Sequence, residues 1–376
     1  MSRLELIATA TFGLEAVVKR EIEALGYKIL QSEDGKITYL GDEKAVARSN
    51  LWLRSADRVL VRIGEFNAVS FEELFQQTAA LPWEEWIPMD GKFTVNGTSV
   101  KSKLYSISDC QAIVKKAIVE RLKRTYNVEQ FPETGAAYTV KATLLKDRVT
   151  VTLDTSGPGL HKRGYRVRDV AAPIKETLAA AMVQLSFWKP GRILADPFCG
   201  SGTIPIEAAM IGKNIAPGLS RSFASEEWEA IPKDLWKKER KVAFEAIDHE
   251  KDIRIFASDI DKKAINAARA NAEEAGVDDC IDFRIQPVSG LTSQENHGII
   301  IANPPYGERI GEKEQVRRIY GDLKRFMEAN PTWSMYLITS DKEFEKLFRD
   351  KPADRRRKLY NGRIETCYYQ YYGERP

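Results

Sequence analysis

Residues 192–212 read RILADPFCGSGTIPIEAAMIG and contain the pattern that decides the fold. The apolar run that ends at Ala195 predicts a short buried strand, and the apolar residues after Thr203 predict a helix. Gly200 and Gly202 lie in the turn between them, where the lack of a side chain lets the backbone approach a ligand closely. Such a unit indicates an α/β sheet whose ligands bind at the carboxyl ends of the strands. The alternative is a tight turn that binds nothing.

The alternation of strand and helix continues to the end of the chain. Further strands are predicted at 254–260, 281–288, 298–305 and 333–340, with helices at 262–276 and 314–330. Alternating elements of this kind form parallel strands joined by crossover helices. Two β-type runs then flank Asn361-Gly362, which is a strong hairpin signal. We therefore expect a mostly parallel sheet with a terminal antiparallel hairpin.

The first 155 residues have a different pattern, typical of two small α+β units. Helical periodicity is found at 13–26, 70–87 and 106–126, with short strand-like runs between these segments. Residues 156–172 are rich in Gly, Pro and Arg, which favours a linker. The predicted domains are 1–65, 66–155 and 173–376, and the linker separates the last two.

Carboxylates stand at the ends of the first two strands of the C-terminal part. Asp196 heads the glycine turn, where a carboxylate favours a ligand with an amino group. The turn lacks the full GxGxxG of dinucleotide sites and the Gly-Lys-Ser/Thr of a P-loop. Asp259 can bind both hydroxyls of a ribose, and Asp261 can cap the following helix. We assign the ribose to Asp259, although the reverse order fits the same residues.

The segment Asn303-Pro304-Pro305-Tyr306 follows the apolar strand at 298–302. Its prolines remove two backbone donors and stiffen the turn, which leaves the carbonyls of Asn303 and Pro304 as acceptors. The side chain of Asn303 adds another acceptor, and Tyr306 offers a flat ring for stacking a base. Acceptors bonded to both hydrogens of an NH2 group would direct its lone pair at an electrophile. The alternative is a rigid loop that only turns the chain.

Composition excludes several other classes of protein. The chain of 376 residues has a formal net charge of +3, with 30% charged and 43% hydrophobic residues, as in an average globular protein. Its four cysteines form no CxxC pair and its three histidines are isolated, which argues against a disulfide framework or a metal site. The N-terminus lacks the apolar core of a signal peptide, and no stretch approaches the ~18 apolar residues of a membrane span. We expect a cytoplasmic location and no membrane partner.

Basic residues cluster at three places, and an insertion interrupts the C-terminal part. Lysine and arginine grip phosphates without reading sequence, and a cluster in the linker would lie between the two halves. For each cluster, including 121–124 and 355–358, a solvated charged face is the alternative. The insertion at 221–248 predicts a helical segment packed on the flank of its domain. The predicted RNA-binding residues of the linker are Lys162, Arg163, Arg166 and Arg168.

The three motifs DPFCGSGT, SDID and NPPYGER, in this order and each after a strand, resemble those of class I S-adenosylmethionine-dependent methyltransferases. NPPY resembles the branch that methylates amino nitrogens of adenine, cytosine or guanine. The N-terminal half resembles a ferredoxin-like segment (1–65) followed by a THUMP domain (66–155), which is an RNA-binding module. Residues 156–182 and 216–228 are similar to the bacterial group of 23S rRNA guanine-N2 methyltransferases. The resemblance implies a Rossmann-like catalytic domain, S-adenosylmethionine as cofactor and RNA as partner.

The resemblance also implies roles for individual residues. Asp196, Gly200 and Gly202 would cradle the amino-acid part of the cofactor, and Asp259 would bind its ribose. Asn303 and the Pro304 carbonyl would hold the target amine, with Pro305 completing the motif and Tyr306 packed on the base. Many relatives have an Asp where this chain has Gln286, so the residue that contacts adenine is left open. The further cofactor-binding residues that it implies are Pro197, Cys199, Thr203, Ile260, Gln286, Lys175, Glu176 and Thr177.

We therefore predict an enzyme that transfers a methyl group from S-adenosylmethionine to the exocyclic N2 of a guanine in 23S rRNA. Alternatives are the same reaction on tRNA, N6-adenine methylation of a nucleic acid, and, from a different class, a non-catalytic RNA-binding factor in ribosome assembly. A nicotinamide-dependent oxidoreductase fits least well, because the glycine pattern is incomplete and NPPY would have no role.

Overall fold

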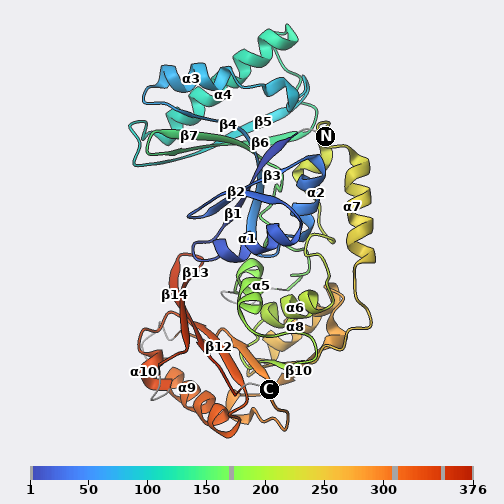
Figure 1. Ribbon diagram of the computed structural model, residues 1–376, viewed down its shortest axis with the longest axis vertical. Helices are drawn as coiled ribbons and strands as arrows, with labels where there is room; N and C mark the ends of the chain where they lie inside the picture. Colours follow the sequence, from blue (N-terminus) through green and yellow to red (C-terminus); the bar gives the residue numbers. More distant parts are fainter. Residues whose placement is uncertain (1–2, 169–172, 307–311, 349–351, 375–376) are drawn as a thin grey trace.

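The computed structural model describes residues 3–168, 173–306, 312–348 and 352–374, and these form two seven-stranded sheets in an elongated molecule (Figure 1). The N-terminal sheet has the strand order β2-β3-β1-β4-β7-β6-β5. Its strands are β1 (Leu4–Ala10), β2 (Lys28–Glu33), β3 (Lys36–Gly41), β4 (Ala56–Asn67), β5 (Lys92–Val100), β6 (Ala137–Leu145) and β7 (Arg148–Asp154). The helices that pack on it are α1 (Glu15–Ala24), α2 (Glu43–Trp52), α3 (Phe71–Ala79) and α4 (Ile107–Tyr126).

The two predicted N-terminal units share this one sheet. The twelve-residue strand β4 pairs antiparallel with β1 on one side and with β7 on the other. The helix expected at 70–87 is shorter than its periodicity indicates: α3 ends at Ala79, and a 3-10 turn follows at Trp83–Glu85. Pro82 lies between them and cannot continue an α-helix, because its ring clashes with the preceding turn.

The C-terminal sheet confirms the predicted fold class. Its order is β10-β9-β8-β11-β12-β14-β13, with parallel pairing from β10 to β12 and antiparallel pairing of β14 with β12 and β13. The predicted terminal hairpin is present, but its turn is one residue later than Asn361-Gly362: Asn361 ends β13 and pairs with Ile364, and Gly362-Arg363 forms the two-residue turn. The strands are β8 (Leu194–Asp196), β9 (Ile255–Asp259), β10 (Ile281–Ile285), β11 (Ile299–Ala302), β12 (Ser334–Thr339), β13 (Arg355–Asn361) and β14 (Ile364–Tyr371).

Helices cover both faces of the C-terminal sheet. One face packs against α5 (Glu176–Leu185), α6 (Thr203–Gly212) and α8 (Lys262–Glu274), and the other against α9 (Glu312–Ala329) and α10 (Phe344–Phe348). Leu14 and Val17, which lie at the start of α1, are buried in the first of these cores, although they belong to the N-terminal half. The two halves therefore share apolar packing and meet at more than a linker.

The insertion between α6 and β9 packs against the N-terminal half, so its predicted place on the flank of its own domain is wrong. It contains a 3-10 turn (Ala224–Glu227) and α7 (Lys233–Glu245), which runs beside α2 (Figure 1). The ring of Trp228 stacks on Tyr138 of β6 with centroids 4.8 Å apart. Phe223 and Trp236 stack at 5.2 Å, and these two residues and Trp228 belong to the N-terminal core. The apolar side chains of the insertion are thus buried against the N-terminal half and not against their own domain.

The linker is fixed in the interior by Arg163, whose guanidinium is only 3% exposed. Its Nε lies 3.2 Å from Oε1 of the fully buried Glu207 in α6. Its other nitrogens donate to the carbonyls of Leu160, at 2.8 Å, and of Arg54 in the N-terminal half. This environment contradicts the prediction that Arg163 binds RNA, since the side chain faces protein and its donors are in use.

We expect Glu207→Gln to destabilise the protein strongly, because it leaves a buried guanidinium without a counter-ion. Removing one partner of a buried pair costs about 3–5 kcal/mol, so the melting temperature of the whole chain should fall by several degrees. Asp234→Asn is the control, since its pair with Lys237 is exposed on both sides and exposed pairs contribute little. A melting temperature of Glu207→Gln equal to that of the control would show that the pair does not hold the joint.

Candidate active site

The three predicted motifs meet at one edge of the C-terminal sheet. Strands β9, β8 and β11 are neighbours and run parallel, with Ala195 opposite both Phe256 and Ile300. The segments that leave their carboxyl ends are therefore adjacent, and they carry Asp259, Asp196 and Asn303 respectively.

The turn after β8 requires its two glycines. Gly200 and Gly202 have φ values of +52° and +83°, a region that residues with a Cβ rarely adopt. A Cβ on Gly202 would also lie 3.0 Å from the Cβ of Ala268 in α8. The amide of Gly202 donates to the Cys199 carbonyl at 2.8 Å, which closes the turn directly before α6.

Asp259 joins the glycine turn to the end of β9. Its carboxylate accepts one hydrogen bond from the amide of Gly200 at 3.0 Å and one from the amide of Asp261 at 2.9 Å. The side chain of Asp261 accepts from the amide of Lys263 at 2.8 Å and caps α8, so its predicted capping role is confirmed. Asp259 is half-buried and keeps further lone pairs for a ligand.

Asp196 is a buried carboxyl with an unsatisfied oxygen. It is 1% exposed; Oδ1 accepts from the amide of Phe198 at 3.1 Å, whereas Oδ2 has no partner among the described residues. Loss of hydration, with a smaller contribution from the charge of Asp259, raises the pKa of Asp196 to about 8. A buried acceptor without a partner costs free energy, and an amino group of a ligand would satisfy it. Asp196, Pro197 and Gln286 line one cavity of about 430 Å³.

Asn303 and Tyr306 are linked to the terminal hairpin. The hydroxyl of Tyr306 donates to Oδ1 of Asn303 at 2.7 Å and accepts from Nδ2 of Asn361 at 3.4 Å. Oδ1 has two lone pairs, so it can accept a second donor. Pro304 is buried and Pro305 is exposed. Asn361 was missed as a site residue, because an Asn-Gly pair in a sequence indicates only a turn.

The other predicted cofactor residues have varied surroundings. The side chain of Ile260 is 67% exposed next to Asp259, and the amide of Gln286 donates to the Asp259 carbonyl at 3.0 Å. Lys175 is exposed and precedes α5. The buried members of the set are Pro197, Cys199, Thr203, Glu176 and Thr177.

Arg166 braces the glycine turn from the linker. It donates to Ser201 Oγ at 2.9 Å and to Thr203 Oγ1 at 3.0 Å, and its Nε lies 2.8 Å from Oε1 of Glu176. These contacts assign Arg166 to the turn rather than to RNA, which corrects the prediction. The sequence could not reveal this role. An arginine that contacts the glycine turn and an arginine that is exposed to solvent look the same in a Gly- and Arg-rich linker. Lys162 and Arg168 are exposed.

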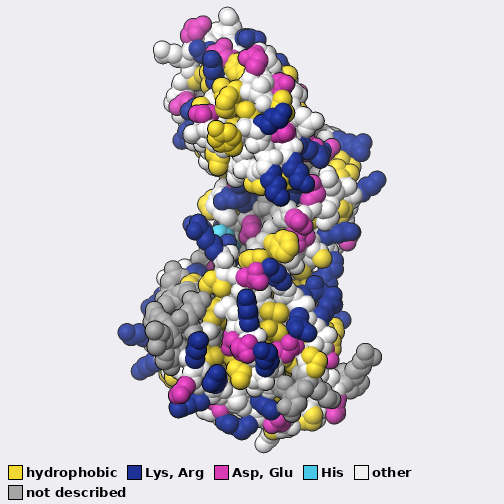
Figure 2. Space-filling model, turned by 90° about the vertical axis from the view of Figure 1, so that its left-hand side faces the viewer, with side chains coloured by type: hydrophobic (Ala, Val, Ile, Leu, Met, Phe, Trp, Pro, Cys, Tyr) yellow, Lys and Arg dark blue, Asp and Glu magenta, His cyan; other side chains and the backbone are white. Residues whose placement is uncertain are grey.

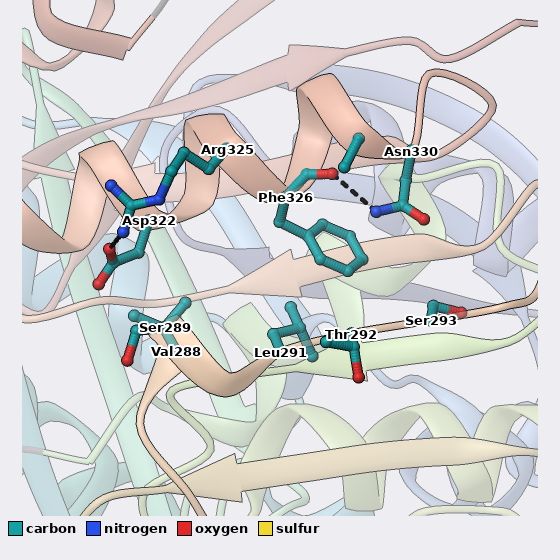
Figure 3. A pocket seen from close by; sticks show the side chains of 10 residues that line it. Val288, Ser289, Leu291, Thr292, Ser293, Asp322, Arg325, Phe326 and Asn330 are labelled. Atoms are coloured by element: carbon teal, nitrogen blue, oxygen red, sulfur yellow. Dashed lines mark hydrogen bonds and ion pairs between the residues drawn. The ribbon is translucent and has the colours of Figure 1, made fainter.

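Two further cavities lie near this edge. One of about 370 Å³ is lined by His161, Lys162, Lys175 and neighbouring residues. The other, of about 300 Å³, lies between the segment after β10 and α9 (Figure 3). The Asp322 and Arg325 side chains on its wall pair with each other, so we assign it no ligand. Within the described ranges, no cluster of three or more His, Cys, Asp or Glu could hold a metal, and no helix is long and apolar enough to cross a membrane.

Comparisons with known proteins match each part of the chain. Family models match residues 163–370 (RMKL-like methyltransferase domain), 5–60 (RlmL ferredoxin-like domain) and 68–154 (THUMP domain). A Bacillus subtilis (strain 168) protein named "Putative RNA methyltransferase YpsC" is 52% identical over all 376 residues, which cover 97% of that protein.

Two solved structures are similar over the whole chain. A Listeria monocytogenes protein, described as a "predicted N6-adenine-specific DNA methylase", is 49% identical with a TM-score of 0.95, and the alignment covers 100% of this chain and 97% of that one. SMU.472, described as a "putative methyltransferase complexed with SAH", is 42% identical with a TM-score of 0.94 over 100% of both chains. SAH is S-adenosylmethionine without its methyl group, and S-adenosylmethionine is accordingly the cofactor of this chain. The unsatisfied Asp196 oxygen and the glycine turn fit its amino-acid part.

We expect Asp196→Asn to stabilise the free protein and to weaken cofactor binding. Folding raises the pKa of Asp196 from 3.8 to about 8, so the folded state holds a proton that the unfolded state releases, and stability falls as the pH rises between these values. The melting temperature of Asp196→Asn relative to wild type should therefore increase from pH 5 to pH 8.

Calorimetry with SAH checks the second part of this expectation. Wild-type affinity should rise from pH 6 to pH 8 as Asp196 ionises, and the variant should lack this component. Comparison with the variant subtracts the titration of the ligand's own amino group. Equal pH profiles for the two proteins would exclude contact between Asp196 and the ligand.

Proposed function

Because this chain belongs to the RMKL-like methyltransferase family, with an RlmL ferredoxin-like domain and a THUMP domain, we propose that it methylates the exocyclic N2 of a guanine in 23S rRNA. The observation that carries the proposal is the position of Asn303 beside the cofactor edge. Asn303 follows β11, next to the strand that carries Asp196 and the glycine turn. Its side-chain carbonyl is an acceptor suited to an NH2 group, which cytosine, adenine and guanine carry.

An RNA substrate is supported by the N-terminal half. The N-terminal half is fixed to the catalytic half through Leu14, Val17 and Arg163, and the insertion stacks Trp228 on Tyr138 of the THUMP domain. The Bacillus subtilis relative, named as an RNA methyltransferase, is aligned over the whole of this chain, so it shares both halves.

The choice of guanine in 23S rRNA rests on the two segments similar to that bacterial group. The start of the first segment (156–182), residues 156–159, contacts Arg221 of the second (216–228). The guanidinium of Arg221 donates to the carbonyls of Gly159, at 2.7 Å, Pro158, at 2.6 Å, and Ser156, at 3.4 Å. The two segments form one joint between the halves. Their similarity to the 23S rRNA guanine-N2 methyltransferases therefore supports the same substrate class for this chain.

In the proposed reaction, S-adenosylmethionine supplies a methyl group on a sulfonium, and the chain aligns the acceptor. Oδ1 of Asn303 and the Pro304 carbonyl accept the two hydrogens of the amine, which orients its lone pair. The same acceptors stabilise positive charge that develops on the nitrogen. The ring of Tyr306 packs on the base, and the amine proton leaves to water after transfer.

An adenine amino group is the second candidate, because the Listeria monocytogenes relative is described as specific for adenine N6 in DNA. Mass mapping of modified nucleosides separates the candidates. In cells that lack the gene, 23S rRNA should lose one N2-methylguanosine, which the wild-type gene restores. Loss from tRNA, or loss of N6-methyladenine from DNA, would replace the proposal with the corresponding alternative.

We expect Asn303→Ala to lower kcat about 10²–10³-fold, the usual effect of removing one preorganised electrostatic partner. The affinity for SAH should remain unchanged, because Asn303 serves the acceptor and not the cofactor. Asn330→Ala is the matched control: it is also half-buried in the C-terminal half, and its Nδ2 donates to the Phe326 carbonyl. A kcat for Asn303→Ala close to that of the control would remove Asn303 from the reaction.

A further inference from the structure

The terminal hairpin meets the loop before α1 (Figure 1). The rings of Phe12 and Tyr360 lie edge to face, with centroids 5.9 Å apart and an interplanar angle of 80°. Gly13 permits this approach: its φ is +90°, and a Cβ there would lie 2.6 Å from the Lys358 carbonyl. Phe12 remains 48% exposed, so part of its ring has no protein partner. We call Phe12, Tyr360, Asn361 and Arg363 the hairpin surface.

The hairpin surface contacts the catalytic segment through Asn361. Asn361 donates to the Tyr306 hydroxyl, which in turn donates to Asn303. Tyr360 directly precedes Asn361 on β13, so the aromatic pair lies on the strand that contacts Tyr306.

The other side of the hairpin surface leads to exposed cations. Thr11, next to Phe12, donates to Asp57 at 3.2 Å, and the Asp57 carbonyl accepts from Leu160 at 2.8 Å. Lys162, two residues after Leu160 in the sequence, lines a cavity together with Lys175. On the hairpin itself, Arg363 is exposed. In Figure 2, which views the molecule from the side of the hairpin, Lys and Arg side chains gather around the narrow waist between the halves.

Tyr360 is held in place by its own strand pair. Nζ of Lys358 lies 5.5 Å from the ring centroid of Tyr360 and 2.6 Å from Oε2 of Glu365. The Tyr360 hydroxyl donates to the same carboxylate at 3.4 Å. The ring therefore lies beside a cation, and the negative charge of Glu365 is paired with Lys358.

We propose that the hairpin surface stacks unpaired RNA nucleotides that flank the target base. This inference rests on the proposed function, because a base must leave its helix before its amino group can reach Asn303. Its neighbours then lose a stacking partner on that side, and aromatic rings next to cations bind such bases irrespective of sequence. A protein partner is less well matched, because the surface contacts Tyr306 of the catalytic segment through Asn361 and has exposed Lys and Arg side chains near it.

The test measures binding of a fluorescein-labelled oligouridine dodecamer and of a dodecamer RNA duplex by anisotropy. The double variant Phe12→Ala with Tyr360→Ala should bind the single strand about tenfold more weakly, or worse, with little change for the duplex. Phe12→Trp with Tyr360→Phe should retain single-strand binding, because both rings remain. Phe244→Ala is the matched control, since its ring is 65% exposed on α7, away from the hairpin.

Each outcome has a defined meaning. Unchanged single-strand binding by the double alanine variant overturns the inference, and an equal loss for the duplex shows phosphate contact instead of stacking and also overturns it. SAH affinity, measured in parallel, should equal that of wild type and shows that the double variant is folded. Failure of the wild type to methylate rRNA would overturn the proposed function and leave this binding result intact.

Discussion

The buried ion pair of Arg163 with Glu207 is the constraint on which the arrangement of the molecule depends. Neither side chain is accessible to water, and the guanidinium also donates to carbonyls of the linker and of the N-terminal half. A charge in such a place is tolerated only when every partner is present. Linker, α6 and N-terminal half must therefore assemble together, and the Tyr165 hydroxyl, 3.1 Å from Oε1 of Glu207, closes the same joint.

The same linker also contacts the glycine turn, because Arg166 lies three residues after Arg163. Arg166 holds Ser201 and Thr203 on either side of Gly202, so the turn that meets the cofactor is braced by a segment from outside its own strand–helix unit. Within that turn, Asp196 is buried with one oxygen unsatisfied, which destabilises the free protein. The packing around the joint offsets this cost and keeps a binding group ready for its ligand.

The sequence predicts the C-terminal sheet and its ligand-binding edge well, because each strand–turn–helix unit is specified by residues that are close together in the sequence. It does not separate exposed from buried cations: Lys162 and Arg163 are neighbours in a basic run, yet the first is exposed and the second is interior. Nor does it show which core an apolar segment joins, so the aromatic residues of the insertion carried no sign that Trp228 would stack on Tyr138. The contact of Asn361 with Tyr306 was equally hidden, since it depends on strand order.

Residues from both ends of the chain lie close to the catalytic edge. Leu14 and Val17 lie in the core beneath α5 and α6, while Phe12, just before them, touches the terminal hairpin. The hairpin in turn reaches Tyr306. A flexible tether would let the THUMP domain sample many positions, whereas shared core packing fixes its distance from Asn303. Under the proposed function, such a fixed distance selects an RNA by the spacing between its bound region and its unpaired guanine, because only a correctly folded RNA reaches both places at once.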